Sequence, residues 1–186
     1  MSETELIERA RAGDTDAFGE LVKLHQAAVY RAARAALHSA DEAEDVAQEA
    51  FVAAYRKLGE FRGDASFKTW LLAITWNHAR SRRRTTRRWL QRFASSDERH
   101  APDPPAREQS HEDVLVKADL AEHVRRLAVT LPPKFRDVML LAASGDHTLE
   151  EIGGMFGIPT GTVKWRLSEG RRHLRAKLAG LGIGDE

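Results

Sequence analysis

Arginine is the most strongly clustered residue type in this sequence, and its side chain is well suited to binding phosphate groups. Residues 80–92 contain seven arginines and no acidic residue. A second basic block, residues 164–177, contains six basic residues and one acid, Glu169. A single charged run usually marks a solvated helix face, but two such blocks favour a polyanionic partner. In the first block, Arg80, Arg83 and Arg84 are the predicted phosphate-binding residues.

Acidic residues are concentrated in residues 41–49, which hold five acids and no base. In a helix over these residues, the face opposite the apolar side combines acidic groups with an exposed valine. Such a face repels nucleic acid and suits docking to a protein, whereas a solvated face is the ordinary alternative. The residues of this predicted docking face are Asp45, Gln48, Glu49, Val52 and Arg56.

A helix is predicted to begin after Ser66 and to continue into the first arginine block. Its outer face would carry Trp76 and Arg80, with Asn77 on one flank. Aromatic side chains among basic residues are what stacking on unpaired nucleotides requires. The alternative is that Trp76 packs beneath a neighbouring helix. On the inner stripe of this helix, we expect His78 to be a core residue.

The loop before this helix, residues 61–67, is predicted to form part of a pocket. Gly63 allows the chain to bend close to a ligand. Phe67 and Trp70 lie on the inner side of the helix, so we expect them to form the floor of the pocket rather than to stack openly.

The C-terminal basic block lies in a predicted helix-turn-helix. Thr148 and Glu151 form a capping box that opens a short helix, and Gly157 to Pro159 end it. Thr160 can cap a second helix, whose N-terminal amides are suited to binding a phosphate. The predicted duplex-binding residues of this second helix are Thr160, Thr162, Lys164, Trp165, Arg166, Arg171 and Arg172.

Helices dominate the predicted fold. Alanine and leucine together number 47 residues, against 25 for valine, isoleucine and threonine, which favours an all-α protein. Periodic apolar positions predict two small helical domains, 1–93 and 113–186. The intervening stretch 94–112 is proline-rich and aperiodic, so we expect a flexible linker.

Composition disfavours several other classes of protein. The sequence has no cysteine, which excludes disulfides and thiolate metal sites. Its eight histidines show no metal-binding spacing, and no catalytic motif is present, so we expect no enzyme, no metal and no cofactor. No apolar run is long enough to span a membrane, and the acidic N-terminal residues do not suit a signal peptide. A cytoplasmic location is expected.

Three segments together resemble a known family. Residues 43–51 resemble the core-polymerase-binding segment of bacterial RNA polymerase sigma factors. Residues 61–71, with Ile74, Asn77 and the arginine block, resemble the promoter-melting and minus-ten-reading segment of the extracytoplasmic-function group (group IV of the sigma-70 family). Residues 131–136 and 148–174 resemble the same group's minus-thirty-five-reading domain. The order and spacing of the three segments make this resemblance specific.

The resemblance implies that the chain binds core RNA polymerase and directs it to promoters, without a catalytic residue or a cofactor. It implies that the acidic face docks on polymerase and that the C-terminal helix reads duplex DNA. An anti-sigma factor is a further expected partner. Trp165 departs from the family pattern, which usually has a small polar residue there. The residues matched to minus-ten DNA are Phe61, Arg62, Gly63, Phe67, Trp70, Trp76, Asn77, Arg80, Arg83 and Arg84.

The main alternative is a helix-turn-helix repressor or activator that acts without binding core polymerase. It explains residues 148–178 equally well. It leaves unexplained the acidic face, the helix that combines tryptophan with arginines, and the expected linker.

Overall fold

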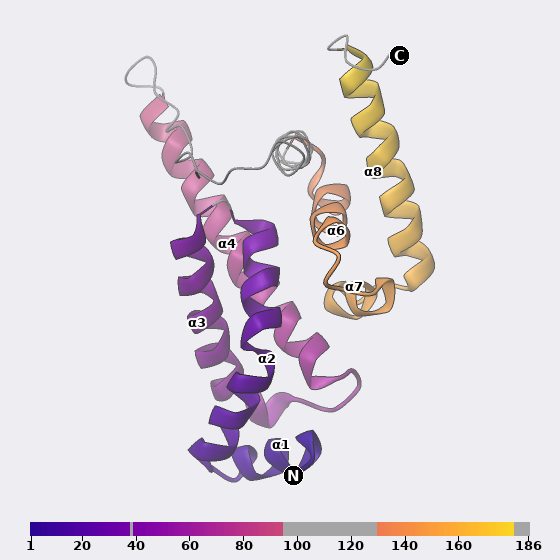
Figure 1. Cartoon of the computed structure of the whole chain (residues 1–186). Helices are drawn as coiled ribbons and strands as arrows, with labels where there is room; N and C mark the ends of the chain where they lie inside the picture. The colour runs from indigo at the N-terminus through magenta and orange to yellow at the C-terminus, as the bar shows by residue number, and fades with distance from the viewer. Residues whose placement is uncertain (38, 95–129, 181–186) are drawn as a thin grey trace, which may run out of the picture.

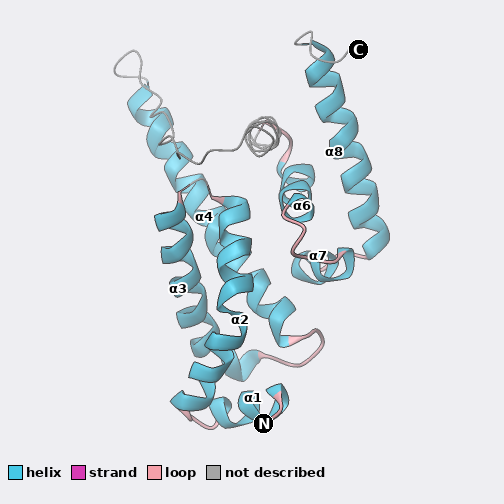
Figure 2. Ribbon diagram, viewed as in Figure 1, coloured by secondary structure: helices cyan, strands magenta, loops and turns pink. Residues whose placement is uncertain are grey.

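The computed structural model describes residues 1–37, 39–94 and 130–180, and all regular elements in these ranges are helices (Figures 1 and 2). The prediction of an all-α fold is therefore confirmed for the described part of the chain. The expected linker 94–112, apart from residue 94 at the end of α4, lies outside the described residues. The elements are α1 (Glu3–Arg11), α2 (Thr15–Ala36), α3 (Ala40–Lys57), the 3-10 turn η1 (Leu58–Glu60), α4 (Phe67–Ala94), α6 (Pro133–Ala143), α7 (Leu149–Phe156) and α8 (Thr160–Gly180).

The N-terminal half is built on α2, α3 and α4, which pack against one another, with α1 crossing their lower end in Figure 1. Alanines are fully buried on α2 and α3, and such small side chains let helix axes approach closely. Larger side chains fill the remaining space and are 0 % exposed: Leu21, Val29, Val46, Leu71 and Leu72. Each buried side chain of this size contributes roughly 1.5–3 kcal/mol by leaving water.

Polar caps define where these helices begin. Asp14 accepts backbone hydrogen bonds at the start of α2. Ser39 accepts the Glu42 amide at 3.3 Å, and Ser66 accepts the Thr69 amide at 3.1 Å. Each cap satisfies an amide that lacks a partner within its helix.

The first helix, α1, was not among the sequence predictions. Its signal is a capping box in which the Ser2 hydroxyl accepts the Glu5 amide and the Glu5 carboxylate accepts the Ser2 amide. Leu6, Ile7 and Ala10 are its buried residues. The three apolar positions of α1 span too few residues for a helical periodicity to be recognised in the sequence.

The C-terminal half contains the predicted helix-turn-helix in α7 and α8. The capping box is confirmed: the Thr148 hydroxyl accepts the Glu151 amide at 3.1 Å, and the Glu151 carboxylate accepts the Thr148 amide at 3.0 Å. Gly157 ends α7 with φ +62°, a conformation that favours glycine. A Cβ on Gly153 would approach the Ile158 carbonyl to 2.7 Å, so the turn requires this second glycine as well.

The two halves touch one another. Helix α7 packs against α4, and α6 reaches α2. In Figure 1 the orange helices α6 and α7 therefore lie beside the N-terminal helices, while α8 forms the far side of the molecule. None of the described helices is long and apolar enough to span a membrane.

Candidate binding surfaces

The predicted docking face lies open on α3. Asp45, Gln48, Glu49, Val52 and Arg56 are all exposed and line one shallow groove. Val52 is 51 % exposed, which is unusual for an apolar side chain surrounded by charges. The opposite side of α3 is buried against α2 and α4, so the helix separates its two faces as the periodicity predicts.

Arginine from α4 reaches this face, which the sequence did not reveal. The Arg82 guanidinium pairs with the Glu49 carboxylate and lies 3.8 Å from Asp45. The first arginine block is thus divided, because Arg82 turns toward α3 whereas its neighbours point elsewhere. Helical spacing of 100° per residue could have indicated the division, but not the partner.

The prediction that His78 is a core residue is wrong. Its side chain is 36 % exposed, and its Nδ1 lies 3.4 Å from the Glu49 carboxylate at the rim of the groove. At this level of α4, the buried positions are Thr75, Trp76 and Ala79. These three positions are buried because α4 packs against α2 and α3 on one side and against α7 on another.

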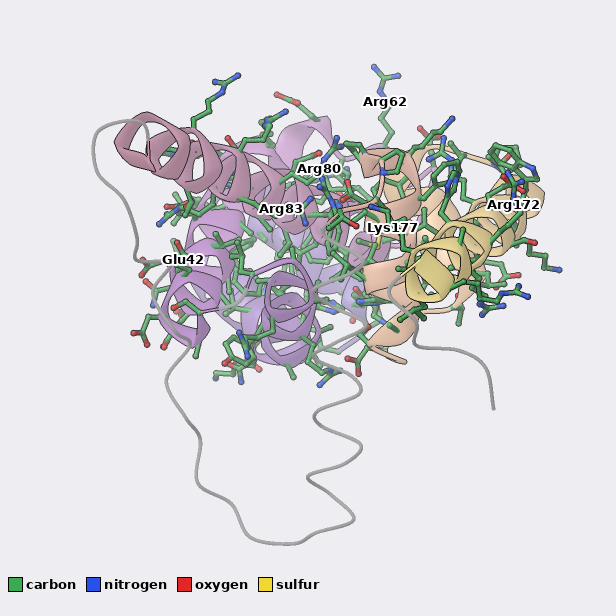
Figure 3. All side chains as sticks on the ribbon, turned by 90° about the horizontal axis from the view of Figure 1, so that it is seen from above. Glu42, Arg62, Arg80, Arg83, Arg172 and Lys177 are labelled. Atoms are coloured by element: carbon green, nitrogen blue, oxygen red, sulfur yellow. The ribbon has the colours of Figure 1, made fainter. Side chains whose placement is uncertain are left out.

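The aromatic floor of the predicted pocket is present. Phe61 and Phe67 are buried, Trp70 is half-buried, and the three rings lie 5.2–5.7 Å apart between centroids. Gly63 has φ +80°, so the bend in this loop needs a glycine. The Arg62 side chain points into solvent beside the pocket, as Figure 3 shows.

Arg11 of α1 holds the loop in place and was missed by sequence reasoning. Its guanidinium donates to the carbonyls of Leu58 and Phe61 and lies 5.7 Å from the centre of the Phe61 ring. A side chain 50 residues away in sequence thus satisfies the loop backbone. No local pattern could have identified this contact.

The prediction that Trp76 lies on the outer face of α4 is wrong. Trp76 is 1 % exposed, and its ring meets the Phe156 ring of α7 edge-on at 6.2 Å. The α7 helix covers it, which is the alternative that the sequence left open. Asn77, the next residue, is exposed.

The remaining arginines of α4 face two environments. Arg84 is exposed, whereas Arg80 and Arg83 converge on Asp137 of α6, at 3.1 and 2.8 Å (Figure 3). Arg136 also contacts this carboxylate, at 3.3 Å. Burial lowers the pKa of the Arg83 guanidinium, and Asp137 opposes this shift. Arginine stays protonated despite this lowered pKa. The buried Asp137 carboxylate is therefore surrounded by positively charged side chains.

Helix α8 presents a basic outer face. Lys164, Trp165, Arg171 and Arg172 are exposed, whereas Thr160, Thr162 and Arg166 are half-buried. Its inner residues Val163, Leu167, Gly170 and Leu174 are buried. The helix begins one residue earlier than the cap prediction, since the Pro159 carbonyl accepts the Val163 amide and Thr160 already lies in the first turn.

Trp165 stands out on this face, at 52 % exposed. Its ring meets Phe135 of α6 at 5.9 Å, and the Lys134 ammonium lies 5.9 Å from its centre. Arg172, further along, pairs with Glu169 at 2.6 Å and points away from the body of the molecule in Figure 3. The described residues contain no cluster of groups able to hold a metal ion.

Known families and proteins match both halves of the chain. Residues 21–89 match the family Sigma-70 region 2, and residues 122–176 match Sigma-70, region 4. The chain is 33 % identical to the ECF RNA polymerase sigma factor SigW of Bacillus subtilis, over 94 % of this chain and 96 % of the relative. It is 32 % identical to the ECF RNA polymerase sigma-E factor of Escherichia coli K12, over 97 % and 96 %.

Among solved structures, the chain is similar to CnrH in complex with the cytosolic domain of CnrY. The TM-score is 0.62 and the identity 27 %, covering 94 % of this chain and 96 % of that one. The similarity spans both halves.

Proposed function

The chain belongs to the extracytoplasmic-function group of the sigma-70 family and is a sigma factor that binds core RNA polymerase and directs it to promoters, and we propose that it does so through three separate surfaces. The observation that carries this proposal is the open acidic face of α3 on a chain that also contains a basic helix-turn-helix. A DNA-binding protein that acts alone has no use for a surface that repels DNA.

For core polymerase, we propose that the docking face of α3 makes the contact. Its acidic groups lie around the half-exposed Val52, so a basic, partly apolar partner would find both charge and apolar area. Charge complementarity of this kind sets partner choice and association rate. His78 and Arg82 lie at the edge of the same face and hold Glu49 in position.

For the minus-ten strand, we propose that the pocket lined by Phe61, Gly63 and Trp70 receives a base pulled from the stack. Arg62 also lines this pocket, and Asn77 follows Trp70 about two turns further along α4. Taking a base out of a duplex costs a few kcal/mol, and aromatic surfaces can return 1–3 kcal/mol per stacked base. Arg80, Arg83 and Arg84 follow within two turns, where they would bind the backbone of the displaced strand. In this proposal Phe67 supports the pocket from below.

For the minus-thirty-five element, we propose that α8 enters the major groove. Lys164 and Arg166 flank the outward face, and Arg171 and Arg172 follow along the helix. Thr160 lies at the start of the helix, where a phosphate is favoured, and the Thr162 amide already donates to the Pro159 carbonyl. Trp165 would add an apolar contact to this face.

The proposal gives this chain a binding role and no reaction of its own. The domain limits 1–93 and 113–186 belong to it as well, with a linker between them. Because polymerase and promoter DNA are cytoplasmic in bacteria, we place the chain there. An anti-sigma factor completes the proposed set of partners, in line with the structure of CnrH in complex with the cytosolic domain of CnrY.

Gel shifts with and without core polymerase test the proposal. The chain should bind promoter duplex strongly only when core polymerase is present. Strong duplex binding by the chain alone, unaffected by core polymerase, would instead indicate a repressor or activator.

A further inference from the structure

A tryptophan lies on the face of α8 that the proposed function turns toward DNA. Trp165 is 52 % exposed, and at 100° per residue it is opposite the buried Val163 and Leu167. The exposed Lys164 precedes it, and the exposed Arg172 follows two turns later, so this side of the helix attracts a polyanion. The face therefore combines positive charge with a broad apolar ring.

Contacts from α6 hold this ring in place. The Phe135 ring meets the Trp165 ring edge-on, with centroids 5.9 Å apart, and the Lys134 ammonium lies 5.9 Å from the centre of the indole. Phe135 is itself buried, and its ring lies 5.2 Å from that of His173. An indole supported in this way has already lost much of its rotational freedom, so binding a ligand costs it less entropy.

The chemistry of indole limits what Trp165 can recognise. The side chain offers a wide apolar surface and one N–H donor, and it has no acceptor. In the major groove, thymine presents an apolar C5 methyl group, whereas guanine and adenine present acceptors. The adjacent Lys164 is charged and is therefore the stronger donor to such acceptors. Apolar contact with a thymine methyl is thus what Trp165 adds to this face.

The position of Trp165 along the helix suits contact with a base. Helix α8 begins at Thr160, so Trp165 lies in its second turn. In a helix-turn-helix, the N-terminal residues of the second helix are the ones that contact base edges. Helix α8 forms the far side of the molecule from α2, α3 and α4 (Figure 1), and the N-terminal half leaves the indole accessible.

We propose that Trp165 is a specificity-determining residue, which selects thymine at one position of the minus-thirty-five element by packing its ring against the C5 methyl group. Lys134 and Phe135 are positioning residues that hold the ring in the orientation that the methyl group meets. The inference deepens the proposed function and rests on it, because the contact forms only if α8 enters the major groove.

The first experiment uses holoenzyme formed from the full-length chain and a pool of DNA duplexes randomised over both promoter elements. Sequencing of the bound duplexes gives the base preference at every position for the unmodified chain, Trp165→Ser and Trp165→Phe. We expect the unmodified chain to select thymine at one position of the minus-thirty-five element, and Trp165→Ser to lose that preference alone. Trp165→Phe should keep it, because phenylalanine retains an apolar ring and lacks the N–H. Thermal melting checks that each chain folds.

The second experiment replaces the selected thymine with uracil, which differs from thymine only in lacking the methyl group. Unmodified holoenzyme should bind the uracil duplex about fourfold more weakly, the equivalent of about 0.8 kcal/mol for one buried methyl group. Trp165→Ser should bind the thymine and uracil duplexes equally. The same replacement at a thymine between the two promoter elements is the matched control and should change neither affinity.

Three results would overturn the inference and leave the proposed function intact. They are an unchanged thymine preference in Trp165→Ser, an equal loss of affinity by that variant for all sequences, and an unchanged affinity of the unmodified chain for the uracil duplex. The uracil test uses the unmodified chain, so it decides the question even if Trp165→Ser does not fold. If the unmodified holoenzyme shows no base preference anywhere in the minus-thirty-five element, α8 does not read duplex DNA, and the proposed function itself is wrong at this surface.

Discussion

The docking face of α3 and the strand-reading face of α4 belong to the same three-helix unit, yet one is open and the other is covered. Val52 on α3 is 51 % exposed, whereas Trp76 on α4 is 1 % exposed beneath α7. Among the described residues, the acids of α3 pair with Arg82 and His78 of their own half, whereas Arg80 and Arg83 pair with an acid of the other half. Under the proposed function, this difference would leave the α3 face accessible to polymerase while the α4 face is covered.

Reversing the charge of the docking face should have the largest effect. Asp45→Arg/Glu49→Arg should weaken core polymerase binding by about 100-fold, or about 2.7 kcal/mol, because attraction becomes repulsion. The melting temperature should barely change, since exposed substitutions alter stability by about 0.5 kcal/mol or less. Titration of labelled core polymerase measures the affinity.

Asp16→Arg/Glu20→Arg on α2 is the matched control, with the same charge change at the same spacing on exposed positions. It should bind core polymerase nearly as the unmodified chain does. If both variants lost the same affinity for core polymerase, the loss would come from the change in net charge, and the α3 face would have no special role.

A change on α8 tests a DNA surface that the contact between the two halves leaves exposed. Lys164→Ala should weaken promoter binding by the holoenzyme by about tenfold and lower the slope of log affinity against log salt by about one, if the lysine binds a phosphate. Gel shifts over a salt series give both values. Lys177→Ala, near the other end of α8, is the comparison, and an identical loss there would mean that α8 acts only through its total charge.

Loosening the pocket should have a smaller effect. Arg11→Ala removes the donor to the Leu58 and Phe61 carbonyls and should cost about 1–2 kcal/mol of folding stability, the net value of two hydrogen bonds. It should slow promoter opening while leaving core binding unchanged. Permanganate footprints and thermal melts measure the two quantities, and unaltered opening would show that the loop needs no support from α1.

Acid should loosen the contact between the two halves slightly. Burial lowers the pKa of His147, which faces Asp146 and Glu151 of its own half and Lys68 and Arg31 of the other. Its neutral form favours this contact, so that contribution is complete above the ordinary pKa of about 6.5 and is lost as pH falls below it. The Glu151 carboxylate, whose pKa is lowered beside Lys68, adds a loss only below its ordinary range.

Binding of a fluorescent oligo(dT) strand at pH 7.5 and pH 5.5 tests this direction, with the affinity expected to rise in acid as α4 becomes less covered. The variant His147→Gln cannot take up the proton and should lose most of the change between these two values. An equal rise in this variant would assign the pH response to other groups.

Much of this molecule could be predicted from its sequence, because local rules decide local features. Caps at Ser66 and Thr148 start helices in the predicted places, and the acidic face of α3 is exposed as its period requires. The family resemblance was likewise carried by short segments in a fixed order.

The sequence predictions were wrong where the C-terminal half of the chain covers the N-terminal half. Helical periodicity assigns one inner face to a helix, but α4 is buried on two sides, which hides Trp76 and leaves His78 at a rim. The contacts of Arg11 with Phe61 and of Arg83 with Asp137 join residues about 50 positions apart. Whether the individual site residues bind polymerase or DNA stays a prediction.

A disulfide that holds α7 on α4 tests the comparison most directly, because a Cβ placed on Gly154 lies 4.0 Å from the Thr69 Cβ. Thr69→Cys/Gly154→Cys, oxidised, should bind core polymerase within about tenfold of its reduced form, because the α3 face stays open. The resulting holoenzyme should fail to open a promoter that the reduced holoenzyme opens, as measured by permanganate reactivity of the minus-ten strand. Reduction should restore opening in the same sample. Promoter opening by the oxidised holoenzyme at the rate of the reduced one would contradict the account.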